Sequence, residues 1–292
     1  MIINSDNQKL TKTDLAKSIG VSRSSLYYKP ILPLKDLLVK TRVEEVLSNN
    51  PSYGHKRVAL ELKMNKKKIL RVMKKFNIKP YKRRVKKPVK LDDINREPAI
   101  FKNEIKDIIP NKPNEIWVAD FTYTKFQNRF YYLATVMDLF TREIIGWNIL
   151  INHDKYLVLE TLNMAMQKTN TAPDYHHSDQ GSEYDSIKYI NKFKENNIII
   201  SMSGKGHPWE NGFQESFYSQ FKLDLGRPDQ FDTLAELIEA IYLKMNYYNT
   251  TRIHTSLKTS PIKFRNQYLL KQTILNIKNL KNINLQTFRQ SV

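Results

Sequence analysis

The chain has 292 residues and carries 48 Lys and Arg against 29 Asp and Glu, a net charge of +19. It contains no cysteine, which excludes disulfides, thiolate zinc sites and cysteine nucleophiles, so any metal ion must be held by oxygen or imidazole. Since no stretch approaches the ~18 apolar residues of a membrane span and the amino terminus lacks a signal-peptide pattern, we expect a cytoplasmic protein with a polyanionic partner.

The positive charge is concentrated in one part of the chain. Between Lys56 and Lys90 there are sixteen Lys or Arg residues and one acid, Glu61. Such a cluster predicts contacts with a phosphate backbone and binding that weakens steeply as salt is added. Charge alone also fits the basic surface of a ribosome-associated protein, so it does not decide between the two.

The first predicted element is a helix-turn-helix segment over residues 1–34. Gly20 would form its turn and Ser22 would cap the second helix, which would present Arg23 to a DNA groove. The expected inter-helix core consists of Leu15, Ala16, Ile19, Val21 and Leu26. Many helical hairpins share this spacing without binding DNA, so by itself the segment leaves DNA binding open.

A second unit with the same spacing is expected over residues 35–80, where a helix near 35–48 precedes it. Asn65 would cap its second helix, and Lys63 stands where the turn favours glycine. Its predicted DNA-binding residues are Lys56, Arg57, Lys66, Lys67, Lys68, Arg71, Lys74 and Lys75. Two such units in tandem, the second this basic, favour a DNA-binding module.

An α/β domain is expected over residues 114–268, after a stretch at 81–113 that we interpret mainly as a linker because prolines interrupt it. Three strands are followed by helix, strand, helix, strand and helix, the element order of a ribonuclease-H-like fold with a mixed five-stranded sheet and flanking helices. The expected strands are 115–124, 130–139, 144–151, one that ends at Asp179, and 198–201, and the first two helices are 154–168 and 186–196. Residues 269–292 form a tail of unknown role.

Three acids are placed where this fold gathers ligands. Asp120 lies inside an apolar strand, a costly position unless a cation compensates its charge. Asp179 ends a short strand, and Glu215 lies on a helix away from its buried stripe. Together they suit two Mg²⁺ ions in phosphodiester chemistry, with Asp120 bridging the ions. Taken singly, each acid is more often a turn cap or a surface residue.

Residues near these acids receive lesser roles. The buried stripe of the helix is expected to comprise Phe213, Phe217 and Phe221, and Lys222 on the face of Glu215 is a predicted DNA contact. Residues 203–207 are expected to form a mobile loop over the site. Asp138 is assigned a structural role, and His176 and His177 are assigned to packing because hard cations prefer oxygen.

Taken together, these residues resemble the integrase core of the insertion sequence 3 family of transposases, specifically its second-frame product, which is related to retroviral integrases. Asp179 and Glu215 have 35 residues between them, the interval of the Asp, Asp-35-Glu signature. The residues around the acids also match, at 117–123, 177–181 and 211–217. Residues 51–58 resemble the start of the family's helix-turn-helix, and residues 248–261, which include Arg252, resemble its closing motif.

The resemblance implies a polynucleotidyl transferase that binds terminal inverted repeats, exposes a 3′ hydroxyl and joins it to target DNA. It implies two Mg²⁺ ions, or Mn²⁺ in their place, at Asp120, Asp179 and Glu215, and Arg252 as a DNA contact. The implied partners are double-stranded DNA, further copies of the chain and an upstream-frame protein or a fusion with it, in the bacterial nucleoid. Two alternatives remain: a non-catalytic DNA-binding regulator derived from a transposase, and a ribonuclease H, which leaves the amino-terminal modules unexplained.

Overall fold

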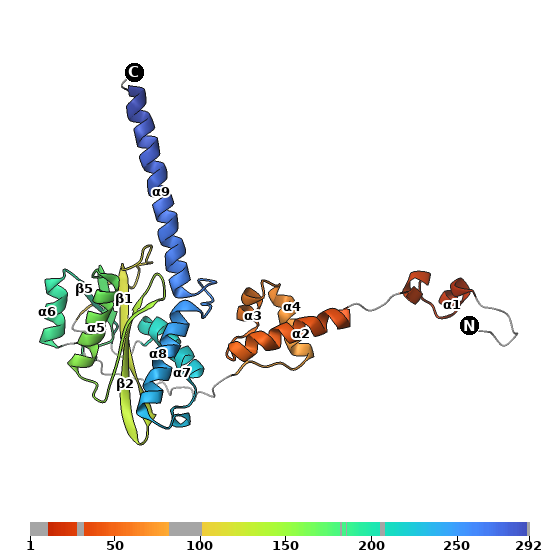
Figure 1. Cartoon of the computed structure of the whole chain (residues 1–292), viewed down its shortest axis with the longest axis horizontal. Coiled ribbons are helices and arrows are strands. Elements are labelled where there is room, and N and C mark those ends of the chain that lie inside the picture. Colours follow the sequence, from red (N-terminus) through yellow and green to blue (C-terminus); the bar gives the residue numbers. More distant parts are fainter. Residues whose placement is uncertain are drawn as a thin grey trace. The chain divides into compact units, whose positions relative to one another are not determined.

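The computed structural model describes residues 11–27, 32–81, 101–181, 183–184, 186–204 and 208–290. The chain divides into two compact units after Pro80 (Figure 1). Each unit is built around its own buried side chains, so each is described by itself.

The first described segment is not the expected helix-turn-helix. α1 (Lys12–Ser18) begins at a capping box and is followed by Gly20 with φ 70°, but η1 (Arg23–Tyr27) is a short 3₁₀ helix rather than a recognition helix. Ile19 is 56% exposed and Val21 42%, and among residues 11–27 Ala16 alone is buried. A segment this short buries too little apolar surface to offset the cost of ordering a second helix.

The second predicted unit consists of three packed helices, the first of which begins before the expected boundary at residue 35. They are α2 (Leu32–Asn49), α3 (His55–Glu61) and α4 (Lys66–Lys75). Asn65 caps α4 by accepting a hydrogen bond from the backbone N of Lys67 at 2.8 Å, and Lys63 occupies the turn at φ 51°, where glycine would be unstrained. The helices bury Val39, Val43, Val46, Tyr53, Val58, Ala59, Ile69, Val72 and Met73.

The larger unit contains the expected mixed five-stranded sheet, in the order β3-β2-β1-β4-β5. β1 pairs antiparallel with β2 and parallel with β4, while β2–β3 is antiparallel and β4–β5 parallel. The strands are β1 (Ile116–Phe126), β2 (Arg129–Asp138), β3 (Ile144–Leu150), β4 (Tyr175–Ser178) and β5 (Ile199–Met202). Gln127 and Asn128, both at positive φ, form the two-residue turn of the β1–β2 hairpin.

Helices cover both faces of this sheet (Figure 1). α5 and α6 pack on one face, where Trp117 and Ala119 of β1 belong to the core, and α7 and α8 pack on the other, with Ile116 and Val118. Alternate residues of β1 therefore enter opposite cores. The helices are α5 (Lys155–Thr169), α6 (Ile187–Glu195), α7 (Gly212–Leu225), which follows η2 (Pro208–Asn211), and α8 (Leu234–Thr250), which follows η3 (Pro228–Gln230).

The prediction of a linker over residues 81–113 is wrong for residues 101–113. The backbone N of Glu104 donates to Ser201 Oγ at 2.9 Å, the O of Lys102 accepts from Met202, and Ile105 and Ile108 pack against the core. Residues 101–113 therefore belong to the α/β unit, because β5 needs a neighbour for its polar groups. Residues 82–100 lie outside the described residues.

The last helix, α9 (Pro261–Gln290), runs through the boundary that we expected at residue 269. Its first turns are anchored by Phe264 and Tyr268, which contact Phe140, and by Arg265, which pairs with buried Glu143 at 2.6 Å. Residues 271–278 are exposed. No helix in the described part of the chain is long and apolar enough to cross a membrane.

Candidate active site and nucleic-acid interface

Asp120 and Asp179 follow the last paired residues of the parallel strands β1 and β4. β4 pairs with β1 at Ile116, Trp117 and Val118, opposite Tyr175, His176 and His177. If this register is continued by two residues, Asp120 is opposite Asp179. The alternation of β1 places the side chain of Asp120 on the face of α7, as the sequence predicts.

The carboxyl group of Asp120 carries the clearest electrostatic signature of the molecule. Burial and, after it, the negative charges of Asp179 and Glu215 together raise its pKa to about 7. The backbone N–H of Phe121, which donates to Oδ1 at 2.8 Å, and the charge of Lys222 oppose the shift. The three acids therefore share one electrostatic environment, in which a buried carboxyl group is incompletely compensated.

Glu215 lies near Asp120 because hydrogen bonds hold α7 against β1. Four side chains on α7 or at its start donate hydrogen bonds to β1 carbonyl oxygens: Asn211 to Ala119 at 3.1 Å, Gln214 to Val118 at 2.6 Å, Tyr218 to Asp120 at 2.6 Å and Lys222 to Tyr123 at 3.0 Å. Glu215 itself is exposed, beside this bonded face.

The buried side of α7 is broader than the predicted stripe. Phe217 and Phe221 are buried as expected, but Phe213 is 47% exposed and lies 3.9 Å from the guanidinium of Arg142. Gln214 and Tyr218 are buried instead. Polar side chains are enclosed here because the carbonyl groups of the sheet supply their partners, which an apolar periodicity does not reveal.

Two residues beside Asp179 escaped the sequence analysis. Glu183 is 6% exposed, and its charge adds to burial in raising the pKa of Asp179, while the N–H of Gly181 lowers it. Glu183 Oε1 contacts His153 Nδ1 at 2.6 Å. His153 and Glu183 are 30 residues apart, so no sequence spacing indicates that they are in contact. The one signal in the sequence is that Glu183 is an acid only four residues after Asp179.

A metal site is not assembled in this arrangement. Among the described residues, no group of three or more His, Asp or Glu is disposed to hold an ion. The three carboxyl groups nevertheless suit a hard divalent cation, which prefers oxygen ligands. The charges of Asp179 and Glu215 both act on Asp120, and a cation would offset this repulsion. The loop expected over the site falls partly outside the described residues, at 205–207.

Asp138, His176 and His177, to which we assigned structural roles, make hydrogen bonds or packing contacts inside the α/β unit. Asp138 accepts hydrogen bonds from the backbone N of Asn114 and from the N and Oγ1 of Thr141, each at 2.6 Å. His176 packs against Phe193, and His177 Nδ1 contacts Ser201 at 2.9 Å. Burial lowers the pKa of His176 to about 3 and that of His177 to about 4, so both are neutral at pH 7.

The basic unit presents most of its predicted DNA contacts on α3 and α4. Lys56, Lys66, Lys67, Lys74 and Lys75 are exposed, whereas Arg57 and Lys68 are half-buried. Arg71 and Lys75 also serve the fold, since Arg71 forms two bonds with buried Asp36 of α2, at 2.6 and 2.7 Å, and Lys75 a third at 2.9 Å. Hydrogen bonds from Arg71 and then Lys75 lower the pKa of Asp36 to about 2.

One predicted DNA contact is withdrawn. Arg252 is 2% exposed, and its guanidinium donates to Asp224 Oδ2 at 2.6 Å and to Gln220 Oε1 at 2.7 Å, which ties the end of α8 to α7. Its role is therefore structural. Lys222 is half-buried and Arg23 is exposed, so both remain available to a partner.

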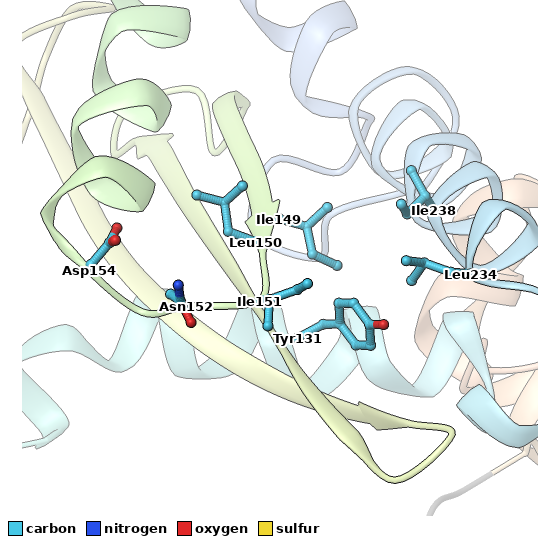
Figure 2. A pocket seen from close by; sticks show the side chains of 8 residues that line it. All are labelled: Tyr131, Ile149, Leu150, Ile151, Asn152, Asp154, Leu234 and Ile238. Carbon is cyan, nitrogen blue, oxygen red and sulfur yellow. The ribbon is translucent and has the colours of Figure 1, made fainter.

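The cavity between β3 and α8 is separate from the acids. It measures about 330 Å³, and Figure 2 shows Tyr131, Ile149, Leu234 and Ile238 converging on it. The one acid in its lining, Asp154, caps α5 by accepting from Tyr156 N at 3.0 Å. Apolar walls without convergent polar groups give this cavity no catalytic chemistry.

The sequence of the chain is similar to integrase core domains and to transposases of insertion sequences. Residues 110–208 and 196–261 match the family described as integrase core domain. The putative transposase InsK for insertion sequence element IS150 of Escherichia coli is 32% identical over 288 residues, covering 91% of this chain and 97% of that protein. The transposase for insertion sequence element IS904 of Lactococcus lactis is 36% identical over 147 residues, covering 50% of this chain and 58% of that protein.

A solved structure of the HTLV-2 integrase catalytic core domain in complex with magnesium is 17% identical, with a TM-score of 0.44. It covers 53% of this chain and 97% of its own.

Proposed function

The chain belongs to the insertion sequence 3 family of transposases with an integrase core, and from this premise we propose that Asp120, Asp179 and Glu215 are its catalytic acids. The protein acts in DNA transposition. The observation that carries the proposal is the convergence of charge, since both other acids raise the pKa of buried Asp120. Acids with raised pKa values at the carboxyl end of a parallel strand pair support a functional site in such a sheet.

The three carboxylates would hold Mg²⁺, or Mn²⁺ in its place. Two such ions, when bound, activate an attacking oxygen and stabilise a leaving oxygen in an in-line displacement at phosphorus. Asp120 would bridge the pair, because it feels the charges of both other acids. Asp179 and Glu215 would each hold one ion. Neutralising the mutual repulsion of the acids would also let the carboxylates approach one another.

We propose two successive phosphodiester exchanges. Water displaces the 3′ oxygen at an element end, which leaves a 3′ hydroxyl, and that hydroxyl then displaces an oxygen of the target strand. Lys222 donates to Thr122 Oγ1 at 2.6 Å and is thereby fixed beside Asp120, where its charge would position a phosphate.

The amino-terminal half would bind the terminal inverted repeats. The exposed lysines of α4 support this role, with Lys56, Arg57 and Arg23 as further contacts. We also propose that several copies assemble on DNA in the bacterial nucleoid, and that the upstream-frame protein or a fusion with it adds contacts.

The test uses the full chain with labelled DNA that carries the element's ends, in Mg²⁺ or Mn²⁺. Asp179→Asn is compared with Asp229→Asn, which removes an exposed acid paired with Arg227 in the same unit. We expect nicking by the parent and by Asp229→Asn, and none by Asp179→Asn.

Circular dichroism checks that all three proteins fold. DNA binding without nicking by any of them would favour the regulator, and cleavage confined to RNA–DNA hybrids would favour the ribonuclease H. Either result would overturn the proposed activity.

A further inference from the structure

A row of aromatic side chains lies on one face of the β1–β2 hairpin, and the proposed chemistry does not use it. Tyr123 stands opposite Tyr132, and Phe130 stands opposite Lys125, so these side chains share a face with Phe121. Tyr131 points the other way, into the cavity of Figure 2. The row is thus distinct from the apolar core under the hairpin.

The row begins next to Asp120 in the chain, on the face of β1 opposite to the Asp120 side chain. Phe121 follows Asp120 directly, and its ring lies 6.4 Å from that of Tyr184, whose raised pKa reflects burial and, to a lesser degree, the charges of Asp120 and Asp179. At about 3.3 Å per residue, the row extends about 10 Å along β1 to Tyr123. This length matches about three stacked nucleotides of a strand whose phosphate lies at the acids.

The outer end of the row is open to solvent. Tyr123 is 58% exposed and Phe130 46%, although their rings are ordered edge to face with centroids 5.5 Å apart. The inner end is supported, because the His153 ring lies parallel to Phe121 at 6.0 Å and 4.6 Å from Tyr132. Two large exposed rings held in a fixed geometry are a ready surface for another flat ring.

Positively charged side chains border the outer end of the row. Lys125 stands opposite Phe130 on the same face, and residues 121–137 contain no acid. Lys222 Nζ, bonded to Thr122, lies 5.5 Å from the centre of the Tyr123 ring. Exposed aromatic rings bordered by cations are the features that bind single-stranded nucleic acid, because the bases stack and the phosphates pair with the cations.

We propose that Tyr123 and Phe130, bordered by Lys125 and Lys222, form a stacking site for unpaired bases of the DNA strand that enters the acids. The proposal rests on the proposed function for the location of that strand. It adds a binding site that holds frayed bases beside the cleaved phosphate, whatever their sequence, since every base offers a π face.

The test measures binding of the full chain to two DNAs in EDTA, where no cleavage occurs. One is a blunt duplex of the element's end, and the other adds an unpaired tail of three nucleotides containing 2-aminopurine. We expect tighter binding of the tailed DNA and quenching of 2-aminopurine fluorescence. Tyr123→Ala and Phe130→Ala should each lose on the order of tenfold in affinity for tailed DNA and leave blunt DNA unchanged.

Matched variants separate stacking from folding. Tyr123→Trp should keep the preference for the tail, and Tyr242→Ala, which removes an equally exposed ring from α8 at 59% exposure, should change nothing. Equal losses on both DNAs, or no quenching by the parent, would overturn the proposal. A change in oligomeric state with tail binding intact would assign the face to a protein contact instead.

The two proposals fail differently. If the parent never nicks DNA but prefers the tail through Tyr123, the stacking site stands without the catalytic assignment. If nicking requires Asp179 and yet Tyr123→Ala binds the tail normally, the catalytic assignment stands and the stacking site falls.

Discussion

Asp120 and Asp179 occupy the same level of two parallel strands, one inside β1 and the other just past the end of β4. The β1–β4 ladder ends at Val118 and His177, two residues before these acids, and the charge of Asp179 acts on Asp120 there. A position that suits ion binding is costly for the ion-free protein, because burial and repulsion act on the same carboxyl group.

The first prediction concerns that cost. Asp120→Asn should lower nicking by more than about a hundredfold, since it removes the proposed bridging ligand. The same change should raise the Tm of the ion-free protein by at least about 2 °C, because an amide carries no charge into the buried site. Parallel nicking assays and thermal melts in EDTA measure both effects. A variant that is inactive because it is less stable would contradict this account.

The second prediction concerns pH. Asp36 has a pKa of about 2 in the folded state, below its ordinary 3.8, so its bonds to Arg71 and Lys75 stabilise the basic unit above pH ~4. This contribution should be lost as pH falls from about 4 to about 2. Hydrogen exchange of α2 and α4 peptides, corrected for intrinsic rates, should show Asp36→Asn less protected at pH 6 and equal to the parent at pH 2. Glu44→Gln, which removes an exposed partner of Lys40, is the control and should change little.

The third prediction separates two cations of α4. Lys67→Ala should reduce the slope of log affinity against log salt by about 1 and leave stability unchanged, because this exposed side chain would contact phosphate alone. Arg71→Ala should also lower protection of α2 from exchange, since it removes two bonds to buried Asp36. Titrations of element-end DNA at several salt concentrations measure the slopes, and identical behaviour of the two variants would rule out the dual role of Arg71.

The fourth prediction concerns Arg252. Arg252→Ala should destabilise the α/β unit by about 3–5 kcal/mol, because it leaves Asp224 beside an empty buried site. The salt dependence of DNA binding should not change. Arg227→Ala, at an exposed pair, should cost less than about 1 kcal/mol. Denaturant unfolding measures the difference, and a stable Arg252→Ala protein with a shallower salt slope would restore the DNA-contact role.

Local patterns in the sequence predicted much of this fold. The β1–β2 pair follows from two runs of aromatic and β-branched residues separated by the polar residues 127–129, and the start of α4 follows from Asn65. These features depend on neighbours in the chain. The helix-turn-helix prediction for residues 11–27 was wrong. These residues have the expected spacing but too little apolar surface to pack two helices, and Ile19 is therefore exposed.

The sequence suggests the three proposed acids, but it does not reveal the residues that support them. Asp120, Asp179 and Glu215 stand out as acids in an ordered pattern. Contacts between distant segments, such as His153 with Glu183 or Arg252 with Asp224, depend on the tertiary arrangement alone. A buried arginine in particular is indistinguishable by sequence from an exposed one, since its partner decides which it is.

The four bonds from α7 to β1 have a mechanical consequence. Any breathing of the domain would carry the glutamate and the first aspartate as one rigid piece, so room for a bulky substrate has to open on the side of the second aspartate. Because the bonds come from successive turns of α7, this helix cannot slide along β1 without breaking them.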